Sequence, residues 1–213
     1  MQKTLLTLAL VAGLAGAANA QRSIRARSQP SSGLSLGVKA GGSLSQLNNT
    51  DDVKYESIYG YHAGVFANIT LSKYFAFQPE LLYSQKGAKI VINAPYDYTR
   101  RLHYVDVPLL FHVNTGGFFL EAGPQVGILV AARDKVGDVT TVVNKDENFT
   151  NADFSFIGGL GYQRKAGLGV GLRYVAGVTS INKPLAQGAS TIQKEARNSV
   201  LQLYLTYSFN ASK

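Results

Sequence analysis

The chain has 213 residues and a formal net charge of +8, but only 16% of its residues are charged. Soluble domains average about 25% charged residues, whereas this chain combines low charge with 22 glycines, 12 tyrosines and 10 phenylalanines. It has no cysteine, which excludes a disulfide framework, a thiolate metal site and a thiolate nucleophile. This composition favours a membrane-embedded β-structure over a soluble domain.

The first twenty residues have the features of a secretory signal peptide. Lys3 makes the start positive, residues 5–17 are apolar, and residues 18–20 (Ala-Asn-Ala) form a small-x-small cleavage motif. The apolar stretch is shorter than the roughly 20 residues that a membrane-spanning helix needs, and a buried N-terminal helix is the alternative. We therefore expect export, removal of residues 1–20, and a short periplasmic segment over residues 21–33.

Eight segments of the remaining chain alternate apolar and polar residues between turn residues, which is typical of β-strands. In chain order they cover residues 34–45, 59–71, 74–86, 102–113, 118–131, 154–163, 168–178 and 199–209. Each comes close to or exceeds the roughly 9 to 11 residues that a tilted transmembrane strand needs.

The last of these segments shows its two faces most clearly. One face consists of Leu201, Leu203, Leu205, Tyr207 and Phe209, and the other of Val200, Gln202, Tyr204, Thr206 and Ser208. Segments 74–86 and 102–113 repeat this pattern, with charged residues on the polar face. Such alternation suits a wall with lipid outside and a polar interior.

The links between the segments alternate between short and long. The short links cover residues 72–73, 114–117 and 164–167, and the long ones cover residues 46–58, 87–101, 132–153 and 179–198. Outer-membrane barrels have short periplasmic turns and longer external loops, and a sheet in lipid must close because an open edge leaves backbone groups unpaired. We therefore predict an all-β, eight-stranded antiparallel up-and-down transmembrane β-barrel over residues 34–209, followed by a C-terminal tail at residues 210–213.

Four of the segments also resemble the strand signatures of a known family. The stretch FQPELLYSQKG at residues 77–87 is similar to the third-strand signature of the PorT-like outer membrane β-barrel family, and YVDVPLL at 104–110 to its fourth. EAGPQVG at 121–127 and GVKAG at 37–41 resemble the fifth and first strands. The resemblance covers nearly the whole mature chain and implies a barrel in the outer membrane of a Gram-negative bacterium. It also implies, as one alternative, an accessory role in protein secretion across that membrane, to which founding members are linked.

The alternation places six charged residues inside the barrel, five of them at similar depths and Lys86 nearer the long loops. They are Lys39, Glu80, Lys86, Asp106, Glu121 and Arg173. Because a buried charge must be paired, we predict a network in which Lys39 and Arg173 neutralise the three carboxylates, with Lys86 one or two layers nearer the long loops. The network is either a structural plug or a path for protons or solutes. The narrow interior of an eight-stranded barrel favours the plug.

Aromatic and basic residues in the second and fourth long links are candidates for external contacts. They are Tyr96, Tyr98, Arg100, Arg101, Lys183, Lys194 and Arg197. Such residues suit lipopolysaccharide or another envelope protein, although ordinary solvated loops have a similar composition. Basic residues at the periplasmic rim suit anionic lipid head groups. The sequence has no basic stripe of the kind that binds nucleic acid.

Catalysis has little support in the sequence. His62, His103 and His112 fall at different levels of the predicted barrel, so we expect no dyad with a carboxylate and a structural role for each. Metal-ligand spacing such as H-x-x-x-H is absent, and we expect no enzymatic activity, cofactor or metal. Three functions remain: a structural or interaction barrel that acts through its external loops and periplasmic rim, a narrow channel, and a soluble lipocalin-like barrel. The last would need an apolar interior, the reverse of the alternation.

Overall fold

The computed structural model describes residues 33–49, 54–91, 97–137, 139–143, 149–181 and 196–209. The predicted signal peptide, the periplasmic segment up to residue 32 and the C-terminal tail lie outside these ranges. The strands are β1 (Leu34–Asn49), β2 (Lys54–Glu56), β3 (Ile58–Thr70), β4 (Phe75–Val91), β5 (Tyr98–Thr115), β6 (Phe118–Val136), β7 (Val139–Val143), β8 (Ala152–Gln163), β9 (Leu168–Gly177) and β10 (Ala196–Ser208). In the described part of the chain, no helix has the length and apolar character needed to cross a membrane.

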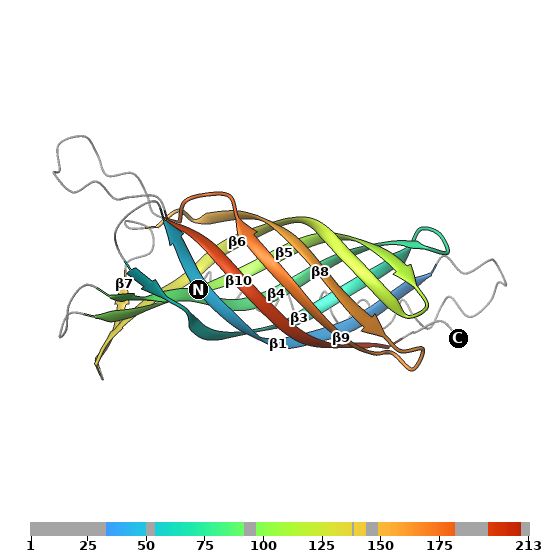
Figure 1. Ribbon diagram of the computed structural model, residues 1–213, viewed down its shortest axis with the longest axis horizontal. Coiled ribbons are helices and arrows are strands. Elements are labelled where there is room, and N and C mark those ends of the chain that lie inside the picture. Colours follow the sequence, from blue (N-terminus) through green and yellow to red (C-terminus); the bar gives the residue numbers. More distant parts are fainter. Residues whose placement is uncertain are drawn as a thin grey trace, which may run out of the picture. The chain divides into compact units, whose positions relative to one another are not determined.

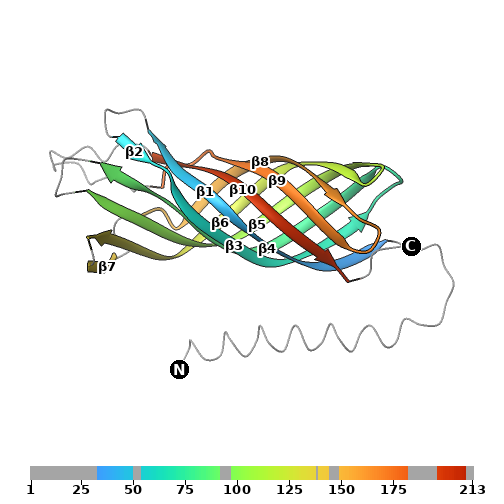
Figure 2. The ribbon, with the colours of Figure 1, turned by 60° about the horizontal axis from the view of Figure 1, so that its bottom comes forward.

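The eight long strands close into a ring (Figures 1 and 2). Neighbouring long strands pair antiparallel in chain order, and β10 pairs with β1 to complete the circle. Every long strand therefore has a partner on both sides, which satisfies the backbone groups that lipid cannot. This confirms the predicted all-β, eight-stranded antiparallel up-and-down barrel.

The two ends of the barrel differ. Three tight links lie at one end, the short-turn end, where Gly116 and Gly117 have φ values of 59° and 94°. These left-handed conformations are those of a two-residue hairpin turn, which glycine adopts without a steric penalty. The long links lie at the other end, the loop end, where Figure 2 also shows β2 and β7.

The strands reach further toward the loop end than the sequence pattern predicted. β4 runs on to Val91 and pairs with β5 from Tyr98 onward, and β6 runs on to Val136. The short strands β2 and β7, which pair with β4 and β6, lie in segments predicted as loops. The alternation did not mark these extensions because, beyond the lipid, neither face of a strand has to be apolar.

The outer wall is apolar and the interior is polar, as predicted. On β10, Leu203 and Leu205 point outward, with Leu203 60% exposed, whereas Gln202 and Tyr204 are buried inside. Near the short-turn end the outer wall carries aromatic pairs, including Phe77–Phe111, Phe118–Tyr162 and Tyr207–Phe209. Aromatic girdles of this kind mark the membrane interface of outer-membrane barrels.

Candidate functional site

The barrel lumen holds a first cluster of charges centred on Glu80. Lys39 Nζ donates to Glu80 Oε1 at 2.5 Å, and Arg173 Nη1 donates to Glu80 Oε2 at 2.9 Å. All three side chains are fully buried. In the ring, three long strands separate β4 from β9 on either side, so the Arg173–Glu80 pair crosses the lumen. Glu80 therefore joins opposite walls of the barrel.

Tyr204 links this cluster to Glu121. Lys39 Nζ lies 4.0 Å from the centre of the Tyr204 ring, and Tyr204 Oη donates to Glu121 Oε1 at 2.8 Å. Glu121 was predicted to pair with Lys39 and Arg173. Instead, its direct contacts are with Tyr204 and with His112, whose Nε2 lies 3.4 Å from Glu121 Oε2.

The His112–Glu121 contact corrects the expectation that none of the histidines meets a carboxylate. Both residues are buried, and they are direct cross-strand neighbours on β5 and β6. The tight turn at Gly116 and Gly117 sets this register, because it pairs Thr115 with Phe118 and each step back pairs the next residues. Counting from that turn in the sequence is a signal that identifies the pair. His112 also stacks on Phe119 at 4.9 Å.

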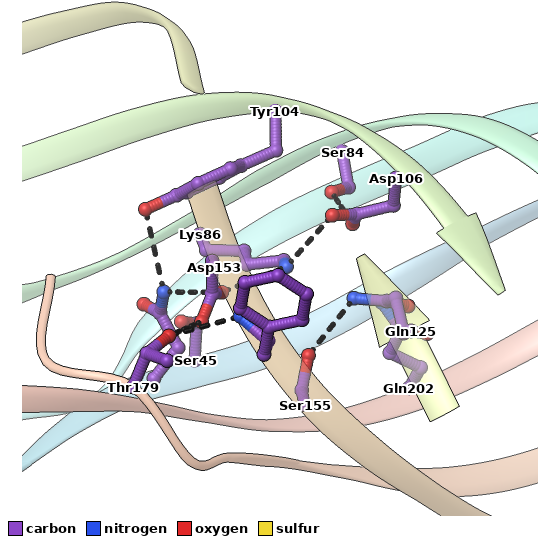
Figure 3. Close-up of polar contacts among 12 residues, drawn as sticks. Ser45, Ser84, Lys86, Tyr104, Asp106, Gln125, Asp153, Ser155, Thr179 and Gln202 are labelled. Carbon is purple, nitrogen blue, oxygen red and sulfur yellow. Dashed lines mark hydrogen bonds and ion pairs between the residues drawn. The ribbon is translucent and has the colours of Figure 1, made fainter. Parts of the chain in front are cut away.

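A second cluster of charges lies nearer the loop end than the first. Figure 3 shows its polar contacts. Lys86 Nζ donates to Asp106 Oδ1 at 3.0 Å and to Asp153 Oδ2 at 3.5 Å. Ser84 Oγ donates to Asp106, Asn198 Nδ2 donates to Asp153 at 2.9 Å, and the Lys86 ammonium lies 4.6 Å from the Tyr104 ring centre. The sequence predicted that Lys39 and Arg173 would neutralise Asp106, and this was wrong: Asp106 pairs with Lys86 instead.

Asp153 was missed because residues 132–153 were interpreted as a loop. It is the second residue of β8 and faces inward with Ser155 and Ile157. Extending the alternation of β8 by one step toward its start would have placed it in the lumen. The second cluster therefore contains one cation and two carboxylates.

An apolar layer fills the lumen beyond the second cluster. Its buried members are Leu47, Ala88, Leu102, Tyr104, Leu129, Ala132, Phe149, Ile181 and Ala196. Phe149 and Ile181 lie outside the long strands and are 1% and 2% exposed. Thr150 N donates to Ile181 O at 2.9 Å, and Ile181 N donates to Ala196 O at 2.9 Å, which ties both segments to β10. The sequence analysis did not predict this layer.

Several polar atoms of the first cluster have no hydrogen-bond partner among the described residues. They include Nη2 of Arg173 and Oε2 of Glu121, together with both ring nitrogens of His62, whose ring lies edge-on to that of Tyr204 at 6.4 Å. Buried polar atoms of this kind are normally satisfied by water. The middle of the lumen is therefore suited to ordered water, in contrast to the apolar layer above it.

The predicted external contacts divide into three groups. Tyr96, Lys183 and Lys194 lie outside the described residues. Arg100 points to the inner face: its Nε and Nη2 donate to the two carboxylate oxygens of Asp134 at 2.9 and 2.7 Å, and its guanidinium lies near the rings of Tyr98 and Phe149. Arg101 and Arg197 are exposed. The structure therefore separates Arg100 and Arg101, which were grouped together, onto opposite faces of β5.

Within the described ranges, no three histidine, aspartate or glutamate side chains form a group that could hold a metal ion. His112 contacts Glu121 and Phe119, and Tyr204 donates to the other carboxylate oxygen of Glu121. The contacts in the lumen are thus ion pairs, hydrogen bonds and apolar packing.

The comparisons with known proteins agree with this architecture. Residues 19–183 match the family described as outer membrane protein beta-barrel domain. The chain belongs to this family. It is accordingly a small β-barrel protein of the bacterial outer membrane, and the soluble lipocalin-like alternative is excluded. No match was found among the curated proteins.

Solved structures similar to this outer membrane protein include neisserial surface protein A, with 16% identity over 83% of this chain and 99% of that chain and a TM-score of 0.53. Ail, the attachment invasion locus protein of Yersinia pestis, has 9% identity over 83% and 99% of the two chains and a TM-score of 0.47. OprG from Pseudomonas aeruginosa has 9% identity over 82% and 95% and a TM-score of 0.46. The likeness to neisserial surface protein A shows the shared fold.

Proposed function

We propose that this protein is a non-enzymatic barrel whose lumen is closed by side chains and whose function lies on its outer surface. In this proposal the external loops contact lipopolysaccharide and other envelope proteins, and the periplasmic rim contacts the anionic lipid head groups of the inner leaflet. The main support is the filling of the lumen by the first charge cluster, the second charge cluster and the apolar layer in succession.

The charge clusters resist opening. Glu80 is 3% exposed and accepts hydrogen bonds from cations on two different strands. Removing one member of a buried, hydrogen-bonded ion pair costs about 3–5 kcal/mol. A solute that passes through the lumen would have to displace Glu80 or its partners and meet a cost of this kind.

The apolar layer is a second obstacle to ions. Leu102, Leu129 and Phe149 are buried together and offer no polar group to replace the hydration shell of an ion. Transferring an unpaired ion into such surroundings is strongly unfavourable. The layer thus supports a lumen that does not conduct.

Single-channel recording in planar lipid bilayers tests the proposal. The mature protein should give no conductance steps above the lipid baseline, whereas a variant that combines Glu80→Ala and Lys86→Ala with Leu102→Ala and Phe149→Ala, and so weakens all three obstacles, should give small, short openings. Leu203→Ala with Leu205→Ala removes apolar volume from the lipid-facing wall and is the matched control, for which we expect no openings. Stable conductance steps in the unmodified protein would overturn the proposal.

A narrow path for protons or small solutes is the second candidate. It is favoured by the polar atoms without protein partners on His62, Arg173 and Glu121, which are suited to a chain of water through the middle of the lumen. Liposomes that contain a pH-sensitive dye distinguish the two candidates. Proton entry that depends on His62, and is abolished by His62→Phe, would favour the path over the plug.

An accessory role in outer-membrane protein secretion is a further alternative, supported by the resemblance of residues 77–87 and 104–110 to the PorT-like family. Deletion of the gene, followed by comparison of the proteins released into the medium, tests this role. Unchanged release in the deletion strain would exclude it.

A further inference from the structure

A basic cleft lies on the outer wall of the barrel toward the loop end. It has a volume of about 290 Å³ and is lined by Tyr61, Gln85, Arg101, His103, Arg133, Lys135 and Thr140. These residues come from five consecutive elements, β3 to β7. We refer to this set as the outer basic cleft.

A β-bulge creates the cleft. The register of β5 and β6 shifts at Tyr104, which pairs with Leu129, while His103 pairs with Ala131. The bulge reverses the facing of β6, since even-numbered residues such as Val130 point outward before it and Arg133 and Lys135 point outward after it. Bulges commonly re-aim side chains in this way. Without the bulge, Arg133 would point into the lumen.

The bulge brings like charges together on the outer face. Arg101 and Arg133 are direct cross-strand partners, and Lys135 is two residues further along β6. In the described part of the chain, none of these three cations forms an ion pair with a carboxylate. Like charges that lie directly opposite each other destabilise a sheet.

The inner face of the same strands shows the contrast. There Arg100 and Asp134 are also cross-strand partners, and they form a two-point ion pair at 2.9 and 2.7 Å. The Arg100–Asp134 pair inside the barrel is therefore electrically neutral, whereas the adjacent Arg101–Arg133 pair outside carries two positive charges. An anion bound in the outer basic cleft would supply the missing negative charge.

The cleft is level with the lipid head groups. Val113, Phe111, Leu109, Val107 and Val105 form the apolar outer face of β5, and His103 and Arg101 follow directly. From Val113 to Val105 the strand climbs roughly 20 Å along the barrel axis, at a rise of ~3.3 Å per residue and a tilt of ~40°. Because the apolar band of such barrels is about 25 Å tall, the cleft lies at its outer edge.

Aromatic side chains border the cleft on the membrane side. Tyr83 Oη lies 2.8 Å from His103 Nδ1, and the Tyr61 and Tyr83 rings are 6.3 Å apart. Tyrosine is enriched at membrane interfaces because one end of its ring is apolar and the other is polar. A ligand that fills the cleft can thus place a charged group on the cations and an apolar or sugar portion against the tyrosines.

We propose that the outer basic cleft binds a phosphate group of a phosphorylated glycolipid of the outer leaflet, that is, lipopolysaccharide. The Arg101 and Arg133 guanidinium groups bind the phosphate oxygens, a geometry for which arginine is better suited than lysine, and Lys135 adds positive charge. This inference rests on the proposed function, since it identifies one lipid contact of the outer surface.

Binding of purified lipopolysaccharide to the mature protein in neutral detergent tests the inference. Arg101→Gln with Arg133→Gln should weaken binding by at least about tenfold, which corresponds to the loss of one charge-assisted contact. The matched control is Arg164→Gln with Lys165→Gln, which removes the same charge from the short-turn end and should change binding less than twofold. Arg101→Lys with Arg133→Lys should fall between the two.

The source of the phosphate is identified by two further ligands. Lipopolysaccharide without its lipid A phosphates should bind the unmodified protein only as weakly as intact lipopolysaccharide binds the double glutamine variant. Inorganic phosphate at millimolar concentration should not compete with intact lipopolysaccharide for the unmodified protein. The inference would be overturned if Arg101→Gln with Arg133→Gln and the control Arg164→Gln with Lys165→Gln lost the same binding affinity. It would also be overturned by undiminished binding of the dephosphorylated lipid or by full competition from inorganic phosphate. Conductance measurements on the same proteins test separately whether the lumen is closed. A conducting protein would contradict the proposed function, whereas loss of the predicted difference in lipopolysaccharide binding would contradict only the inference about the cleft.

Discussion

Arg173 and Glu80 form an ion pair across the lumen, from β9 and β4, although 93 residues separate them in the chain. Neither residue is near the other along the sheet, because several strands lie between β4 and β9 in both directions around the ring. The pair therefore joins two walls of the barrel that have no backbone contact. Its contribution to stability depends on closure of the ring.

The first prediction concerns Glu80. Glu80→Gln leaves the Lys39 and Arg173 charges without their shared carboxylate, and we expect the free energy of unfolding to fall by about 3–5 kcal/mol. Urea titration of the protein in lipid vesicles measures the change. Glu56→Gln is the matched control, because its ion pair with Lys89 is about 40% exposed and exposed pairs contribute only ~0–1 kcal/mol. Similar losses in the two variants would contradict the central role of Glu80.

The second prediction concerns the two carboxylates that share Lys86. Asp106→Asn and Asp153→Asn each leave Lys86 with one partner, whereas the double variant leaves a buried cation with none. We therefore expect the double variant to lose more stability than the sum of the single losses, by roughly 1–3 kcal/mol. The same urea titration of all four proteins completes the cycle. Additive losses would show that Lys86 does not couple the two carboxylates.

The third prediction concerns the apolar layer. Phe149→Ala removes a ring that is 1% exposed. We expect the free energy of unfolding to fall by about 3–5 kcal/mol, because the substitution leaves a cavity that the surrounding barrel cannot fill. Phe156→Ala removes the same ring from the outer wall, where Phe156 is 60% exposed and lipid chains fill the space. A smaller loss at position 149 than at position 156 would contradict the assignment of Phe149 to a packed layer.

The fourth prediction concerns the lipid-facing wall. Leu203 points outward in the middle of β10, and Leu203→Arg should cost about 2–4 kcal/mol, as an arginine near the bilayer midplane does. Val142→Arg, on β7 at the loop end, is the matched control and should cost at most ~1 kcal/mol. Thermal unfolding, followed by the change in electrophoretic mobility on heating, ranks the variants. Equal stability of the two would place Leu203 outside the lipid.

The local sequence pattern predicted the eight long strands and their two faces, and the need to pair every backbone group in lipid then required the barrel to close. Lipid requires an apolar residue at every second position of a strand. Because this period is only two residues long, it can be recognised within a single segment such as 199–209, without knowing which strands pair with it. The tight turn at Gly116 and Gly117 adds a register, because it pairs the residues on both sides at fixed positions, His112 and Glu121 among them.

The tertiary structure decided which charges meet. Asp106 pairs with Lys86 rather than with Lys39, because depth inside a barrel depends on the stagger of strands that are not joined by tight turns. Arg133 faces outward because of a bulge, which breaks the two-residue period at a position that the pattern does not mark. The folding of Phe149 and Ile181 into the lumen likewise has no periodic signal. Alternation is set by the surrounding solvent and is local, whereas pairing across the lumen exists only once all eight strands have closed.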